Sequence, residues 1–182
     1  MAVSKITSIV SSSDMTGQYT LDIGSTTTQF DAFVVDNEYK LLLDMLGAAL
    51  YNTYQADESD VNWVALRDGA TGYTDFAGYI RNWQGLKNML VPYHYSKWIL
   101  SNEFQQSVTS MIMTDHENGG EISYNRRKDI SDKAFNDFLI EYENAYDFMF
   151  SKTSDDSTKY NEFELWFKEK VCKGVIVNRT VR

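Results

Sequence analysis

Cysteine and proline are nearly absent from this sequence of 182 residues, which contains one of each, and histidine occurs only twice. Cys172 has no partner for a disulfide within the chain, and no Cys/His cluster has the spacing of a zinc site. These absences predict a protein that needs no oxidising compartment, binds no metal and uses no cofactor.

Long apolar runs are absent as well. No run approaches the roughly 18 apolar residues that span a bilayer, and the N-terminus lacks the basic-then-apolar pattern of a secretory signal. We therefore expect a soluble protein, made inside the cell, that has no contact with a membrane.

Basic residues are scarce: 17 Lys and Arg stand against 26 Asp and Glu, for a net charge of −9. This balance argues against a protein that grips nucleic acid over its whole surface, because neutralising phosphates requires clustered basic residues. An acidic surface is compatible with DNA that slides past it. The one compact basic run is Arg126, Arg127 and Lys128, which either contacts a phosphate or an acidic neighbour, or is a solvated start of a helix; three charges favour the helix start.

Apolar residues make up 43% of the sequence and aromatic residues 14%. This content is enough for one sizeable core, so one main domain is expected. Tyr, Phe and Trp combine a large contact area with polar groups, which suits an interface between subunits as well as a core. Composition leaves these two uses of the aromatic residues open.

Helical periodicity dominates the middle of the chain and predicts a mainly α fold, a bundle of three to four long helices. The central helix is expected over residues 79–104, with a kink or break near Val91 because Pro92 lacks a backbone N–H. A second helix is expected from Asp36, its N-cap, to Tyr54, with Gly47 inside it. Two further helices are expected from Ser131 to about Lys152 and over residues 158–173.

Polar and β-forming segments flank these helices, so the expected organisation is an extended arm over residues 1–35, a helical domain over residues 36–174 and a β-forming tail over residues 175–182. The arm is either mobile or laid against another surface. The tail has no partner strand nearby in the sequence, which favours pairing with another edge, including that of another subunit. The predicted inter-subunit or partner interface therefore consists of apolar residues in both termini: Ile6, Ile9, Val10, Val175, Ile176 and Val177.

Two places have residue types that are used in catalysis or metal binding. The acidic residues Asp57, Glu58 and Asp60 lie in a connection over residues 56–78 that also holds a short helix near residues 61–67, and they lack the spacing of an EF-hand. His116 lies in a predicted extended excursion or hairpin over residues 105–124, where its neighbours point to opposite faces. Neither place supplies converging partners, so no catalytic residue is predicted.

Four segments together resemble small head–tail connector proteins of tailed phages, most closely those of Bacteroidetes and crAss-like phages. They are Leu43-Asp-Met-Leu-Gly-Ala-Ala-Leu-Tyr51, Trp83-Gln-Gly-Leu with Val91-Pro-Tyr-His-Tyr-Ser-Lys-Trp98, an extended segment with Glu117-Asn118, and the helix over residues 135–150. The resemblance covers roughly residues 36–170 and rests on packing motifs rather than on chemical ones.

The resemblance implies a structural virion protein rather than an enzyme. Such proteins are helical bundles that assemble as homo-oligomeric rings, often of twelve copies, beneath the portal protein of the capsid. They extend the DNA channel and dock the next ring or the tail, and the DNA passes through without sequence-specific binding. The chain would be made in the host cytoplasm and end up in the neck of the virion.

Two other functions remain open from the sequence. One is a monomeric module that binds a partner through its termini. The other is a hydrolase that uses carboxylates such as Asp57, Glu58 and Asp60, which would require a convergent acid pair or a two-metal arrangement.

Overall fold

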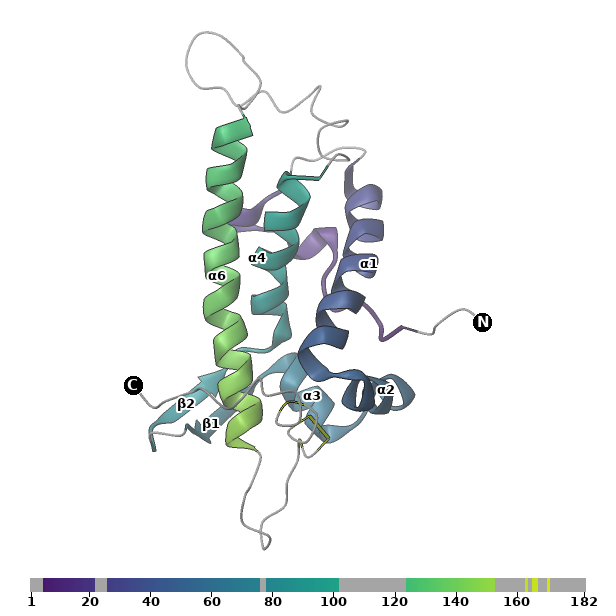
Figure 1. Ribbon diagram of the computed structural model, residues 1–182, viewed down its shortest axis with the longest axis vertical. Helices are drawn as coiled ribbons and strands as arrows, with labels where there is room; N and C mark the ends of the chain where they lie inside the picture. The colour runs from purple at the N-terminus through teal and green to yellow at the C-terminus, as the bar shows by residue number, and fades with distance from the viewer. Residues whose placement is uncertain are drawn as a thin grey trace, which may run out of the picture. The chain divides into compact units, whose positions relative to one another are not determined.

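The computed structural model describes residues 5–21, 26–75, 78–101 and 124–152, together with Phe163, Leu165, Trp166 and Lys170. This part of the chain contains five α-helices, two short 3-10 helices and a two-stranded sheet (Figure 1). The expectation of a mainly helical fold is confirmed. The predicted excursion over residues 105–124, with His116, and the tail over residues 175–182 lie outside the described residues.

The chain divides into two compact units. Unit 1 comprises Met1–Thr7, Tyr39–Leu86 and Glu143–Arg182, and unit 2 comprises Ser8–Glu38 and Lys87–Tyr142. Within unit 2, α4 (Leu86–Ile99) lies between α1 (Thr26–Leu46) and α6 (Tyr124–Ser151) (Figure 1). Aromatic rings form both of these contacts: Phe30 and Phe33 of α1 pack on Trp98, and Tyr93 of α4 packs on Phe138 of α6.

Helix α1 begins at Thr26 rather than at Asp36, so residues 26–35 are helical and not extended. Phe30 and Val34 are fully buried and stand at helical spacing from Leu42. They extend the apolar stripe of the helix towards its N-terminus, and burial of this stripe outweighs the β-forming preference of the local sequence.

Gly47 ends α1 and separates it from α2 (Ala48–Ala56). Its φ of 81° and ψ of 160° lie in a region that is essentially restricted to glycine. The single helix predicted over residues 36–54 is therefore two helices. The break leaves carbonyls at the end of α1 without helical partners, and two side chains from the C-terminal segment satisfy them. Trp166 Nε1 donates to the Met45 carbonyl at 3.2 Å and Lys170 Nζ donates to the Asp44 carbonyl at 2.5 Å.

A short helix and a hairpin follow. Helix α3 (Val61–Asp68) confirms the short helix expected near residues 61–67. The hairpin pairs β1 (Ala70–Thr74) with β2 (Ile80–Trp83) in antiparallel register, with Tyr73 opposite Arg81 and an irregularity between Ala70 and Tyr73. Tyr73 and Trp83 face the core of unit 1, where their rings contact Phe148 of α6.

The predicted central helix is wrong at its start, because residues 80–83 form β2 and α4 begins only at Leu86. Gly85 separates the two elements. It has a φ of 89°, and a Cβ at this position would lie 2.6 Å from the Arg67 carbonyl oxygen. The close approach of the end of α3 therefore requires glycine here.

Pro92 lies inside α4, which continues to Ile99, so the predicted break near Val91 does not occur. Leu90, His94 and Trp98 are buried on either side of the proline, and packing of this face holds the helix together across the missing N–H.

Helix α6 begins at Tyr124, so Ser131 is not its N-cap. Ser131 is instead a buried residue inside the helix, and its hydroxyl donates to the Ser96 carbonyl of α4 at 2.9 Å. Of the predicted last helix over residues 158–173, Leu165, Trp166 and Lys170 are helical, and most of the other positions lie outside the described residues.

Candidate functional site

The N-terminal residues predicted to form an interface are largely covered by the chain itself. Ile6 is buried in unit 1, where its backbone N–H donates to the hydroxyl of Tyr51 at 3.0 Å. In unit 2, Val10 is buried and Ile9 is half-buried. Val175, Ile176 and Val177 lie outside the described residues. A partner-binding role for these six residues stays a prediction.

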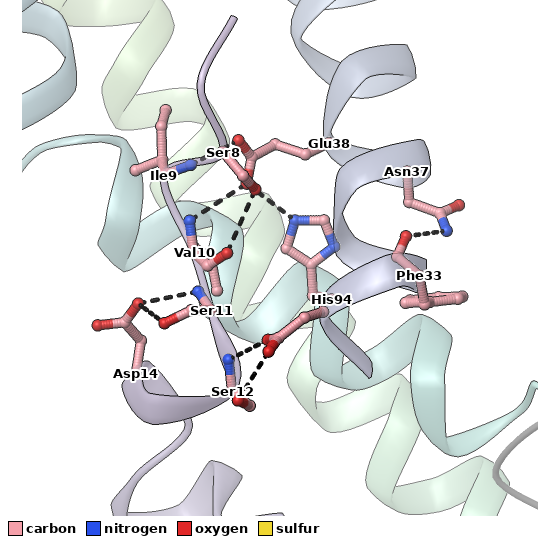
Figure 2. Close-up of polar contacts among 11 residues, drawn as sticks. Ser8, Ile9, Val10, Ser11, Ser12, Asp14, Phe33, Asn37, Glu38 and His94 are labelled. Carbon is pink, nitrogen blue, oxygen red and sulfur yellow. Dashed lines mark hydrogen bonds and ion pairs between the residues drawn. The ribbon is translucent and has the colours of Figure 1, made fainter. Parts of the chain in front are cut away.

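The segment that contains Ile9 and Val10 is held by the carboxylate of Glu38, which projects from α1 (Figure 2). Glu38 Oε1 accepts the backbone N–H of Ile9 at 2.8 Å, and Oε2 accepts the backbone N–H of Val10 and the hydroxyl of Ser8, both at 3.3 Å. One side chain thus satisfies three donors of an extended segment. Two of them are backbone N–H groups, so this contact depends more on the path of the backbone than on the identity of the side chains.

His94 of α4 faces the same carboxylate, with its Nε2 3.5 Å from Glu38 Oε2 (Figure 2). The two side chains are 0% and 4% exposed, respectively. Neither nitrogen of His94 makes a hydrogen bond to the described residues. A carboxylate beside an imidazole is the pairing that general-base catalysis uses, but a catalytic pair must reach its substrate. Here the N-terminal segment covers the pair and uses the acceptor capacity of the carboxylate.

Asp31 forms a second contact on the same face of α1, seven residues or about 10 Å along the helix from Glu38. Its carboxylate accepts the backbone N–H of Ser12 at 2.6 Å and the hydroxyl of the same residue at 3.2 Å. We use the term arm clamp for Asp31 and Glu38, whose carboxylates hold residues Ser8 to Ser12, together with His94, which faces the carboxylate of Glu38.

Asp14 extends the attachment of the N-terminal segment to α4. It caps the 3-10 helix Ser12–Asp14 by accepting the Ser11 backbone N–H at 2.9 Å, and it pairs with Lys87 Nζ at 2.8 Å. Burial alone would raise the pKa of Asp14, but the hydrogen bonds from Lys87 and Ser11 outweigh it and hold the pKa below its ordinary value.

Tyr19 attaches the second 3-10 helix, Gly17–Tyr19, to α6. Its hydroxyl donates to Asp137 Oδ2 at 2.6 Å, and its ring packs edge-on against Tyr95 of α4. Burial raises the pKa of Tyr19, and the hydrogen bond and negative charge of Asp137 raise it further. The N-terminal segment therefore contacts all three long helices of unit 2.

The acidic residues that the sequence offered as catalytic candidates have local structural partners. Asp57 accepts the N–H and hydroxyl of Ser59, which lower its pKa, and Asp60 caps α3 by accepting the N–H groups of Asn62 and Trp63. Glu58 accepts the N–H and hydroxyl of Thr7 at 2.9 and 3.1 Å. The three carboxylates thus cap turns and anchor the N-terminal segment in unit 1.

No group of three or more His, Cys, Asp or Glu side chains that would suit a metal ion occurs in the part of the chain that the structure describes. Within the same ranges, no helix combines the length and apolar character that crossing a bilayer requires. Comparisons with models of protein families, with curated proteins and with solved structures found no match to this chain.

Proposed function

We propose that the chain is a structural subunit of a phage head–tail connector, in which copies form a homo-oligomeric ring that extends the DNA channel below the portal and docks the next ring or the tail. The observation that carries the proposal is the arm clamp. The pair of side chains best suited to chemistry, Glu38 and His94, is closed off from solvent, and its carboxylate holds the polypeptide instead. This use of buried ionisable groups fits a structural protein better than an enzyme.

The exposed apolar residues of the described surface also support an assembling protein. Tyr79 and Ile80 at the start of β2 are 67% and 78% exposed, and Ile140 of α6 is 60% exposed and adjacent to exposed Leu139. Isolated exposed apolar residues are normal, but neighbouring pairs on two different elements suit contacts with other chains. The resemblance of residues 36–170 to connector proteins agrees with this interpretation.

The direct test is assembly on purified portal rings of the same phage. The chain alone, the portal alone and a mixture of the two are sedimented through a density gradient. We expect the chain to move into the portal fraction in the mixture only, at about one copy per portal subunit. If the chain stays at the top of the gradient in the presence of portal, the proposal is wrong for the first position below the portal, and the same mixture with neighbouring connector rings then decides whether it holds for any position.

A further inference from the structure

Among the described residues, the hairpin in unit 1 has two open edges. Strands β1 and β2 pair only with each other among the described residues, so each has one edge without a neighbouring strand in that part of the chain. Alternate N–H and C=O groups of an antiparallel strand point towards that edge and are available to a further strand.

Strand β2 has the features of an acceptor edge. Natural proteins protect open edges with proline, with lysine or with an inward-pointing charge. Strand β2 has no proline, and its one charged residue, Arg81, is paired with Asp75 at the turn. Ile80 and the preceding Tyr79 are largely exposed, whereas Trp83 anchors the strand by donating from Nε1 to the Leu66 carbonyl at 2.6 Å. The strand is thus fixed at one end and offers an apolar surface at the other.

The C-terminus of the chain has the composition of a donor strand. Residues 175–182 read Val-Ile-Val-Asn-Arg-Thr-Val-Arg, with β-branched residues at five of eight positions. Twelve residues follow Lys170, enough to reach about 40 Å when extended. The last eight alone would extend over about 26 Å, which exceeds the length of a four-residue strand such as β2.

We propose that residues 175–182 of one copy add as a strand to the open edge of β2 in a second copy, by main-chain hydrogen bonds and contacts to Tyr79 and Ile80. This inference rests on the proposed ring. Donor and acceptor are different surfaces of one chain, so the contact is heterologous, and such a contact closes into a ring when the rotation between copies fits. Every copy then donates one tail and receives one.

Disulfide cross-linking between two differently labelled copies tests the pairing in assembled rings. Cys172→Ser removes the native thiol from both copies. One copy then has Ile80→Cys, and the other has Ile176→Cys, Val177→Cys or Asn178→Cys, three consecutive positions that sample both faces of the tail strand. Because a disulfide requires Cα atoms within about 7 Å, only a paired strand brings the two thiols together. We expect a disulfide-linked dimer of one copy of each kind with at least one of the three tail positions.

The matched control places the first thiol at Val61, which is 74% exposed in the same unit but lies on α3. We expect no dimer with Val61→Cys. A dimer that forms equally well with both positions would overturn the proposal, as would the absence of any dimer. A chain with both Ile80→Cys and Val177→Cys that closes a disulfide within one copy, with no link between copies, would also overturn it. Electron microscopy of the same samples distinguishes failure of the strand pairing from failure of the proposed function. Rings that form without the cross-link would reject only the strand pairing. Samples that contain portal but no rings would reject the proposed function.

Discussion

The carboxylate of Glu38 lies 3.5 Å from the imidazole of His94 in the interior of unit 2, and the same carboxylate accepts two backbone N–H groups of the N-terminal segment. A buried ionisable pair is not in itself a source of stability, because desolvation offsets the attraction between the partners. Removing Glu38 is nevertheless costly, because the buried N–H of Val10 then has no acceptor. The clamp therefore couples the position of residues 8–12 to the packing of α1 on α4.

Replacing Glu38 with alanine should release the N-terminal segment. Three donors lose their acceptor, of which the Val10 N–H is buried and the Ile9 N–H is part-buried, whereas Ser8 is exposed to water. Because an unsatisfied buried donor costs about 1–3 kcal/mol, we expect the free energy of unfolding to fall by about 2 kcal/mol. Chemical denaturation measures the loss, and hydrogen exchange should show faster exchange at the Ile9 and Val10 amides. Glu38→Gln, which keeps one acceptor, should lose less. The exposed Glu143→Ala is the control and should change stability by no more than about 0.5 kcal/mol. An equal effect of Glu38→Ala and Glu143→Ala would contradict the clamp.

Replacing Gly47 with alanine distinguishes a broken helix from a continuous one. In a continuous helix, alanine would stabilise the protein by up to about 1 kcal/mol. Because Gly47 has a φ of 81° and a ψ of 160°, we expect Gly47→Ala to lower the free energy of unfolding by about 1–3 kcal/mol. Thermal or denaturant unfolding followed by circular dichroism provides the measurement, and an increase in stability would show that α1 and α2 are one helix.

The C-terminal segment should stabilise the end of α1 through its two donors. Trp166→Phe removes the N–H that donates to the Met45 carbonyl and also part of a buried indole ring, so it should cost about 2–3 kcal/mol. Lys170→Met removes a buried ammonium group that donates to the Asp44 carbonyl, a charge-assisted bond at a helix C-terminus, and should cost about 2 kcal/mol. The exposed Leu165→Met on the same segment serves as control. If all three variants unfold at the same denaturant concentration as the parent, the segment does not dock on α1.

The pairing of Asp14 with Lys87 should be visible in the pH dependence of stability. The pKa of Asp14 is lower in the folded chain than its ordinary value, so its contribution is fully present above that value and is lost as the pH falls through the lowered pKa. Lys87→Met should raise the pKa of Asp14, which NMR titration of the carboxyl group measures directly. Lys97→Met, ten residues along the same helix, should leave it unchanged. An unaltered titration of Asp14 in Lys87→Met would contradict the ion pair.

The sequence predicted helices well and their ends poorly. Apolar residues at helical spacing indicated the cores of α1 and α6, but α1 begins ten residues and α6 seven residues before the predicted starts, Asp36 and Ser131. Burial of Phe30 against Trp98 shows that tertiary contacts stabilise the first part of α1. The hairpin was missed because Trp83 continues the spacing of Leu86 and Leu90 and so reads as part of one helix. Only the pairing of β2 with β1 distinguishes the two interpretations, and the apolar spacing along residues 83–90 does not report that pairing.

The arm clamp was not predicted because it joins residues that are 29 positions apart, as in the bond from Ile9 to Glu38. A signal was present nonetheless. Glu38 lies four residues from Val34 and from Leu42, and His94 lies four residues from Leu90 and from Trp98, so both interrupt an apolar stripe. A charged or titratable residue on the buried face of a helix requires a partner, but the sequence alone does not say which segment supplies it.

The central claim, a ring subunit of a head–tail connector, is tested most directly by electron microscopy of purified virions at a resolution that allows this chain to be traced. We predict a closed ring of copies of this chain between the portal and the tail, with the DNA channel running through its centre. Particles that contain the portal and the tail but have no density for this chain in the neck would contradict the account.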